Sequence, residues 1–328
     1  MYLATDQIKR IHLDSTNACS MKCSLCSRTM HTFNSIRHVT LEDIQKWIPA
    51  GTLPNLDTVK YCGNYGDLSN NPHTLDISRY VLTIANRITG NTHGSIRPPE
   101  WWEEFGSLKP EINWSIDGLE DTCGTYKIGA NFDKILSNVK AFIKGGGKAK
   151  WNFIIFDYNE HQIDEARKLA KDLGFIKFKL RIGGRFHASQ KTNVGPSTLY
   201  LKDKKERLGD SLNYSSVYPV SCKYQKQKEI LINSFGMVFP CCFISDYVQQ
   251  GSKGNKDFKN LVEKYGQNFN NLDFYSLSEI LNNKWFKQEL EESWTLYSKN
   301  RLESCSFYCG KKALPNDNGP VFIEKYSQ

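Results

Sequence analysis

Long hydrophobic runs are missing from this sequence. No stretch approaches the roughly 18 apolar residues that a membrane-spanning helix needs, and the N-terminal segment MYLATDQIKRIHLD has no apolar run of the kind found in secretory signals. Internal repeats and long low-complexity tracts are missing as well. We therefore expect a cytoplasmic globular protein with no membrane partner.

Cysteine, by contrast, is plentiful, with 10 residues in a chain of 328. Disulfide frameworks are typical of short exported chains, which this chain does not resemble, so its clustered thiols indicate metal binding or catalysis. With 39% hydrophobic residues the chain can bury a large core, and its length suits one large domain and a smaller one. The net charge of +8 suits an anionic partner, but the basic residues are spread along the chain, and we do not expect nucleic acid.

The first part of the chain alternates strand-like and helix-like segments. Expected strands are 8–14, 57–63, a segment running into 92–94, 111–118, 150–156 and 176–182; expected helices are 41–48 with Thr40 as cap, 75–88, 99–105, 132–144 and 160–174. Such alternation implies parallel strands joined by right-handed crossovers. The sequence predicts an α/β fold in which residues 1–183 form an open or partial (β/α)6 barrel of the TIM type, not a closed eight-stranded one.

This alternation is lost from about Gly183. Residues 184–218 are polar and rich in turn formers, as expected for a connection between domains. Residues 219–328 contain a hairpin pattern at 229–233 and 237–241, an amphipathic helix at 276–293 and a loop carrying CSFYC at 305–309. We expect a small C-terminal α+β domain, built from the hairpin and the helix.

Three thiols are grouped in the loop expected after the first strand: Cys19, Cys23 and Cys26. In parallel barrels the chemistry is placed at this end of the strands. Three thiolates on one short loop can bind three irons of a [4Fe–4S] cluster and leave the fourth iron open to an amino group and a carboxylate. A structural zinc site, completed by His12 or His31, is the alternative.

The spacing C-x3-C-x2-C in CSMKCSLC resembles the signature of the radical S-adenosylmethionine (SAM) enzymes. Three further segments are similar to motifs of that family in the same order: GNYGDLSNNP at 63–72, SIDG at 115–118, and FIIFDYNEHQIDEARKLAKDLGF at 153–175. The resemblance covers nearly the whole chain. It implies that SAM binds the open iron and is cleaved by one-electron reduction to a 5′-deoxyadenosyl radical, which abstracts a substrate hydrogen. It also implies an electron donor such as flavodoxin or ferredoxin.

The resemblance also implies contacts to SAM. The glycine-rich segment meets the methionyl amine in the family, and here Asp67 and Leu68 replace the usual glutamate and proline. The fourth-strand motif lies near the ribose or carboxylate, and the end of the sixth strand lies near the adenine. The residues expected at these positions are Gly63, Asn64, Gly66, Asp67, Ser115, Asp117 and Arg181.

A second group of thiols follows in the C-terminal region. The arrangement C-x13-G-x4-C, from Cys222 through Gly236 to Cys241, resembles the opening of the SPASM and shorter twitch extensions, which hold auxiliary clusters. Cys305 and Cys309 complete four thiolates for one auxiliary [4Fe–4S] cluster, with Cys242 as a spare or as the alternative to Cys241. The full seven-cysteine SPASM pattern is absent from the sequence. A zinc site is again the alternative.

The remaining candidates receive structural interpretations. Cys62 and Cys123 are expected to be small buried apolar residues, and Trp101 and Trp102 to pack a helix against the barrel. His93 and His161 are not assigned a role.

The sequence thus predicts a radical SAM oxidoreductase that modifies a peptide or protein side chain. One alternative is a dehydrogenase or epimerase of a small molecule such as an amino sugar, since the barrel begins almost at Met1 and leaves no room for an N-terminal peptide-recognition domain. The alternative of another class is a non-catalytic zinc or iron–sulfur protein.

Overall fold

A single nine-stranded sheet organises the chain in the computed structural model, which describes residues 2–29, 35–183, 192–201, 219–245, 256–310 and 321–326. The strand order is β8-β7-β1-β2-β3-β4-β5-β6-β9, and only β8 and β9, at the two edges, are antiparallel to their neighbours. The fold is therefore mixed α/β with a mostly parallel sheet, as predicted. The strands are β1 Arg10–Leu13, β2 Thr58–Tyr61, β3 Arg87–Thr92, β4 Glu111–Ser115, β5 Lys148–Ile155, β6 Lys177–Ile182, β7 Glu229–Ile232, β8 Val238–Phe239 and β9 Val321–Lys325.

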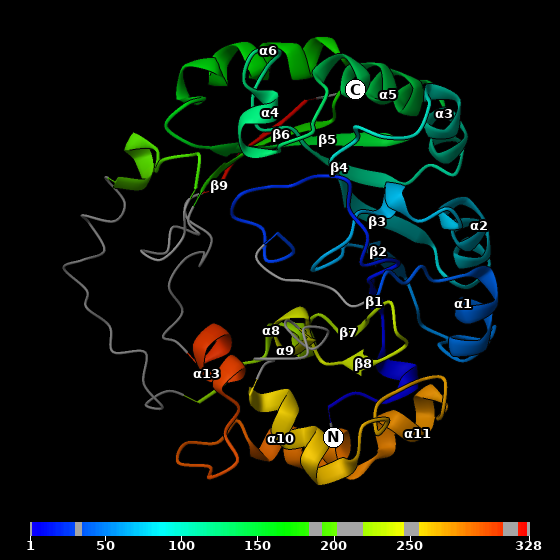
Figure 1. The fold of residues 1–328 in the computed structure, drawn as a ribbon. Helices are drawn as coiled ribbons and strands as arrows, with labels where there is room; N and C mark the ends of the chain where they lie inside the picture. Colours follow the sequence, from blue (N-terminus) through cyan, green and yellow to red (C-terminus); the bar gives the residue numbers. More distant parts are fainter. Residues whose placement is uncertain are drawn as a thin grey trace.

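Helices follow the parallel strands and cover one face of the curved sheet, as Figure 1 shows for α1, α2, α3, α5 and α6. These are α1 Leu41–Trp47, α2 Thr74–Ile84, α3 Pro99–Ser107, α4 Cys123–Tyr126, α5 Phe132–Lys144 and α6 Ile163–Asp172. The C-terminal part adds α8 Lys223–Lys226, α9 Cys242–Ser245, α10 Lys256–Tyr265, α11 Leu277–Asn282, α12 Leu290–Glu292 and α13 Glu303–Cys309. Shorter turns are the 3₁₀ segments η1 Thr5–Gln7, η2 Leu68–Asn70 and η3 Glu160–Gln162, and a π-helical turn, η4 Trp285–Glu289.

The two faces of the sheet differ in chemistry because side chains alternate along each strand. In β5 the residues facing the helices are fully buried, among them Trp151 and Phe153, while Lys150 and Asn152 on the other face are half-buried. On the helix side Trp102 of α3 lies 4.6 Å from Trp114 of β4, between ring centroids. This confirms the expected packing role of Trp102 and leaves the opposite, inner face polar.

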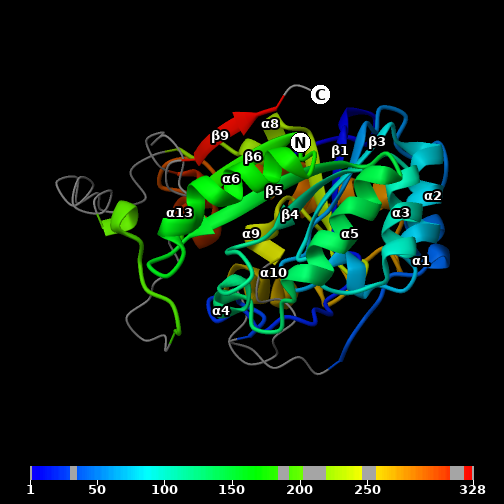
Figure 2. The same ribbon diagram turned by 90° about the horizontal axis from the view of Figure 1, so that it is seen from above.

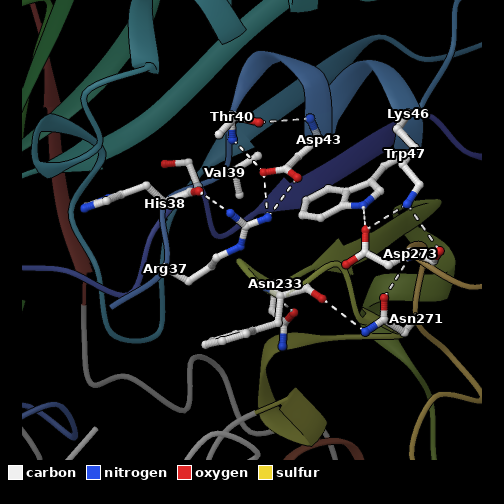
Figure 3. A network of polar contacts seen from close by, with 12 residues as sticks. Arg37, His38, Val39, Thr40, Asp43, Lys46, Trp47, Asn233, Asn271 and Asp273 are labelled. Atoms are coloured by element: carbon white, nitrogen blue, oxygen red, sulfur yellow. Dashed lines mark hydrogen bonds and ion pairs between the residues drawn. The ribbon is translucent and has the colours of Figure 1, made fainter. Parts of the chain in front are cut away.

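The first helix begins where the sequence predicts. The backbone N–H of Thr40 donates to the Asp43 carboxylate at 2.8 Å, and the backbone N–H of Asp43 donates to the Thr40 hydroxyl at 3.1 Å, which satisfies amides left free at a helix start. Arg37 donates to both oxygens of Asp43 (Figure 3). At the other end of α1 the Trp47 indole donates to Asp273 at 2.9 Å, which ties this helix to the C-terminal region.

Several sequence predictions need correction. The helix predicted over 75–88 ends at Ile84, because Arg87 and Ile88 pair with β2 as the start of β3. The helix predicted over 276–293 is interrupted between α11 and η4, and CSFYC is helical, in α13, not a loop. Strand β9 was not predicted; Figures 1 and 2 both place it beside β6.

The predicted hairpin is present as β7 and β8, with Leu231 opposite Phe239. Its first strand pairs in parallel with β1, Arg10 opposite Glu229, so the sheet continues from the N-terminal units into the C-terminal region. Among the described residues, no helix is long and apolar enough to cross a membrane.

Candidate active site

The loop that carries Cys19, Cys23 and Cys26 leaves the carboxyl end of β1 and is closed at its base. Asn17 accepts a hydrogen bond from the backbone N–H of Arg37 at 2.8 Å through its side-chain oxygen, and its own N–H donates to the carbonyl of Arg37 at 3.3 Å. Thr16 and His38 form an isolated bridge beside this pair. The cysteine loop is therefore held at the carboxyl end of β1 by one side-chain and one backbone hydrogen bond, neither of which depends on a metal.

The glycine-rich segment after β2 packs directly on the start of the cysteine loop. The backbone N–H of Asp67 donates to the carbonyl of Ala18 at 2.9 Å. A Cβ placed on Gly66 would lie 1.9 Å from the carbonyl oxygen of Thr16, and one on Gly63 would lie 2.9 Å from the backbone of Gly66. Only residues without a side chain allow this close approach, which explains the two glycines at the predicted positions.

The three thiols of the cysteine loop influence one another. Burial, followed by the nearby Asp67 carboxylate, raises the pKa of Cys19 to about 12, and Cys23 and Cys26 add to this rise. Burial also raises the pKa of Cys23 to about 11, although the Lys127 ammonium opposes the shift. The fold thus brings the predicted trio together in a partly enclosed place, where the Cys19 and Cys23 thiols of the metal-free chain stay protonated at neutral pH.

Asp67 is buried, and its carboxylate is occupied by donors of the chain itself. One oxygen accepts hydrogen bonds from the backbone and the hydroxyl of Ser69, at 2.9 and 2.6 Å, and from the Thr92 hydroxyl at 3.0 Å. The other accepts from the backbone N–H of His93 at 2.8 Å. Asp67 therefore shapes the glycine-rich segment and fixes the turn after β3.

His93 is a residue that the sequence interpretation set aside. Its imidazole is buried, and Nδ1 accepts a hydrogen bond from the backbone N–H of Ser95 at 3.0 Å, which leaves the ring proton on Nε2. Nε2 lies 3.3 Å from the Ser20 hydroxyl, in the cysteine loop. Burial lowers the pKa of His93, with the Asp67 carboxylate opposing the shift, so the ring is neutral at physiological pH. The signal available in the sequence was its position directly after β3, within THG.

A buried ion pair lies on the other side of the cysteine loop. Asp117, which follows β4, is fully buried and pairs with Lys127, which is 6% exposed. Asp117 also accepts a hydrogen bond from the backbone N–H of Ile154 at 2.8 Å. Burial alone would lower the pKa of Lys127, but the Asp117 carboxylate, followed by the neighbouring Cys23, raises it. No spacing pattern marks Lys127 in the sequence, because this residue approaches Asp117 from a separate loop.

The other predicted SAM contacts occupy different surroundings. Ser115 is half-buried at the end of β4, two residues before Asp117. Arg181 is half-buried on β6, and its Nε is buried with no hydrogen-bond partner among the described residues. The Asn64 amide donates to the carbonyl of Cys242 and to the hydroxyl of Ser245, both at 3.0 Å, so it links the glycine-rich segment to α9.

The four C-terminal cysteines of the predicted auxiliary site converge. Cys222, Cys241, Cys305 and Cys309 line one pocket, together with apolar residues that include Phe243 and Trp294. Burial raises the pKa of Cys241 well above its ordinary value, and the neighbouring Cys242, Cys305 and Cys222 add to the rise. The hairpin and helix α13, far apart in the sequence, thus supply thiols to the same place.

Cys242 has different neighbours. Its sulfur lies 3.1 Å from the Tyr224 hydroxyl, and it does not line the pocket of the four cysteines. Cys62, expected as a small apolar core residue, is half-buried on the polar inner face, and its sulfur accepts from the Asn91 amide at 2.8 Å; that expectation is wrong. Cys123 is buried at 1% exposure, as expected.

The zinc alternative for the N-terminal trio named two histidines. His12 is buried, with Nε2 3.3 Å from Asp14 and next to the carbonyl of Cys62, and so does not join the trio. His31 lies outside the described residues. In the ranges that the structure describes, no group of three or more His, Cys, Asp or Glu side chains is arranged to hold a single metal ion.

Comparisons with known proteins support the same fold at low sequence identity. No protein-family model and no curated protein matches the chain. Among solved structures, Streptococcus suis SuiB bound to S-adenosylmethionine superposes with a TM-score of 0.61 and 15% identity, over 92% of this chain and 72% of SuiB. The anSMEcpe structure with bound AdoMet and Cp18Cys peptide superposes with a TM-score of 0.54 and 14% identity, over 92% of this chain and 88% of anSMEcpe. These structural neighbours are radical SAM enzymes, and the chain has their fold.

Proposed function

We propose that this chain is a radical SAM oxidoreductase that acts on a peptide or protein side chain. One observation carries the proposal: a loop with three neighbouring thiols lies at the carboxyl end of β1, and Gly66 and Asp67 of the glycine-rich segment pack against it. The sheet that carries both segments has the fold of SAM-bound enzymes. The peptide part draws on SuiB and anSMEcpe, which have structures with bound peptides. In the proposed architecture, the sheet is a partial barrel with a twitch-like C-terminal extension.

The donor sets fit iron–sulfur clusters. Thiolates are the usual ligands of such clusters, and each iron of a cubane takes one of them, so the ligands need not share a single centre. Cys19, Cys23 and Cys26 would hold the SAM-binding [4Fe–4S] cluster, and the pocket of Cys222, Cys241, Cys305 and Cys309 would hold the auxiliary one. When bound, the first cluster supplies the electron that cleaves SAM.

The chain's own residues then have three tasks. Gly63 and Gly66 keep the glycine-rich backbone close to the cysteine loop, and Asp67 holds that backbone in shape through its four internal hydrogen bonds. The Asp117–Lys127 pair fixes the turn after β4 beside Cys23. The neutral His93 presents its Nε2 proton to the Ser20 hydroxyl at the cysteine loop and does not bring a positive charge there.

Our proposal departs from the sequence prediction for Asp67. That prediction placed the carboxylate on the methionyl amine, whereas both oxygens are engaged by the chain. We propose that Asp67 is a positioning residue and that the amine meets the backbone of the segment that Asp67 organises. Ser115 keeps its proposed place near the ribose or carboxylate.

Anaerobic reconstitution tests the proposal. The wild-type chain is incubated with iron, sulfide, SAM and a strong reductant, and 5′-deoxyadenosine is measured by mass spectrometry. Replacing Cys19, Cys23 and Cys26 by alanine should abolish the product and leave about four irons per chain at the auxiliary site. Cys123→Ala is the matched control, because it removes a buried thiol outside both groups.

Two results would contradict the proposal. Undiminished deoxyadenosine in the triple variant would remove the cysteine trio from the chemistry. Stoichiometric zinc in the purified wild-type chain, with no SAM cleavage, would leave the non-catalytic metal-binding alternative.

A further inference from the structure

Five basic side chains gather on the inner face of the sheet, away from the helices. This inner basic cluster consists of Lys60 on β2, Lys150 on β5, and Lys177, Lys179 and Arg181 on β6. The three β6 residues alternate with Phe178, Leu180 and Ile182, which are buried on the helix side, so they share the other face. Lys150 lies opposite Lys177 in the register of β5 and β6 and faces the same way.

The curvature of the sheet makes these residues into one cluster. Strands β2 and β6 are separated by β3, β4 and β5, which in a flat sheet would place them about 19 Å apart. Figure 1 shows, however, that the sheet curves around its inner face and brings its two halves toward each other. In agreement with this curvature, the pKa of Lys179 is lowered by burial first, then by Arg181 and Lys177, and last by Lys60 on β2.

Most of this positive charge is uncompensated. Lys150 forms an ion pair with Glu111. The other four members form no ion pair with any carboxylate in the described ranges, although all are half-buried. The Nε of Arg181 is buried with no hydrogen-bond partner there, and so is the amide oxygen of Asn152, a neighbour of Lys179 in the strand register. Half-buried cations without counter-charges are costly in a folded chain, and a bound anion would offset that cost.

The cluster leads to the proposed site of chemistry. Lys177, Lys179 and Arg181 follow one another toward the carboxyl end of β6, and Arg181 lies opposite Ile154. The N–H of Ile154 donates to Asp117, whose partner Lys127 lies beside Cys23. A ligand held by Lys179 and Arg181 would thus extend toward the cysteine loop.

We propose that the inner basic cluster binds an anionic group of the substrate, a phosphate or a pair of carboxylates carrying at least two negative charges. The inference rests on the proposed function and narrows its substrate class to acidic peptides or acidic small molecules. Arg181 supplies a planar fork that matches such oxygens, Lys60, Lys177 and Lys179 supply point charges, and Arg181 contacts substrate instead of adenine.

Calorimetric titration of the reconstituted holoenzyme with SAM bound tests the inference. Pyrophosphate and citrate are the probes, and they distinguish phosphate from carboxylate recognition. We expect saturable binding of at least one probe. Lys179→Met and Arg181→Met should each weaken it by about tenfold or more, since each removes a charge-assisted hydrogen bond. Lys140→Met, on the exposed face of α5, is the matched control and should bind like wild type.

The same samples are assayed for 5′-deoxyadenosine, which separates the two proposals. SAM cleavage with no saturable binding of either probe overturns the inference and leaves the proposed function in place. Probe binding without SAM cleavage overturns the proposed function alone. Equal weakening in the Lys140→Met control, or none in the two cluster variants, shows non-specific binding and also overturns the inference. If Lys179→Met does not fold, Lys60→Met takes its place with the same expected loss.

Discussion

Lys127→Met removes one partner of the buried pair with Asp117 and should strongly destabilise the chain. Asp117 is fully buried and Lys127 is 6% exposed, so water cannot replace the lost ammonium. Breaking a buried ion pair by removing one partner typically costs about 3–5 kcal/mol. Asp117 keeps its hydrogen bond from Ile154, which compensates part of its charge, and we expect a loss near the lower end, about 3 kcal/mol.

The double variant Asp117→Asn with Lys127→Met should recover much of that loss, because it leaves no unpaired charge in the interior. The assay is urea unfolding of the metal-free chain, followed by far-ultraviolet circular dichroism and tryptophan fluorescence. Lys144→Met is the matched control: its partner is Glu103, and the two side chains are 72% and 43% exposed. An exposed pair contributes about 0–1 kcal/mol, so this control should unfold almost like wild type.

Two outcomes would refute this reasoning. A loss of less than about 1 kcal/mol in Lys127→Met would mean that Asp117 reaches water or another cation in solution. A double variant no more stable than Lys127→Met would mean that the methionine fits poorly, and that the unpaired carboxylate is not the cause.

The other predictions concern the glycine-rich segment, the auxiliary pocket and the basic cluster. Gly66→Ala should lower both the melting temperature and the iron content after reconstitution, because its Cβ would lie 1.9 Å from the carbonyl oxygen of Thr16. In the control Gly124→Ala, the nearest atom to the new Cβ lies 3.7 Å away, so both quantities should stay as in wild type. Equal iron contents in the two variants would contradict the packing argument. Cys241→Ser should remove about four irons per chain and Cys242→Ser should not, since only Cys241 lines the pocket; the reverse result in iron analysis would reassign the ligand. Burial, Arg181, Lys177 and Lys60 lower the pKa of Lys179, which also faces the Lys150–Glu111 pair. The affinity for citrate, whose carboxylates are already ionised at neutral pH, should therefore fall as pH rises from neutral toward the ordinary lysine pKa of about 10.4. Below the ordinary lysine pKa the unfolded chain binds more protons than the folded one, so Lys179 makes folding stability rise with pH over that range. A probe affinity that does not change with pH over the same range would refute the assignment of Lys179 to the binding site.

Local patterns predicted most elements of the sheet and its helices. The alternation of KWNFIIF and IKFKLRI and the cap at Thr40 predicted β5, β6 and the start of α1, because burial on one face and helix capping act over a few residues. The predicted end of α2 was wrong, because the apolar spacing typical of a helix continues to Ile88, whereas Ile88 pairs with β2 as part of β3. Strand β9 was missed because its partner β6 is remote in sequence.

The candidate site was predictable where it follows a motif. The cysteine trio, the two glycines and the four C-terminal thiols follow recognisable spacing patterns in the sequence, and the members of each group lie close together in the structure. Lys127 and His93 were missed because their roles arise from loops that meet only in the fold. The alternation of Lys177, Lys179 and Arg181 along β6 indicates part of the basic cluster in the sequence. Lys60 joins the cluster only through the curvature of the sheet.

The pairing of β1 with β7 affects how the chain folds during synthesis. Tyr2 donates a hydrogen bond to the backbone of Glu229, 227 positions away, at the place where these strands meet. At roughly 5–20 residues per second, translation takes about 11–45 s to supply that partner. Until then one edge of β1 has no strand to pair with, and an open strand edge is prone to intermolecular pairing. Truncation before residue 229 should therefore yield an aggregating fragment, not an independently folded N-terminal unit.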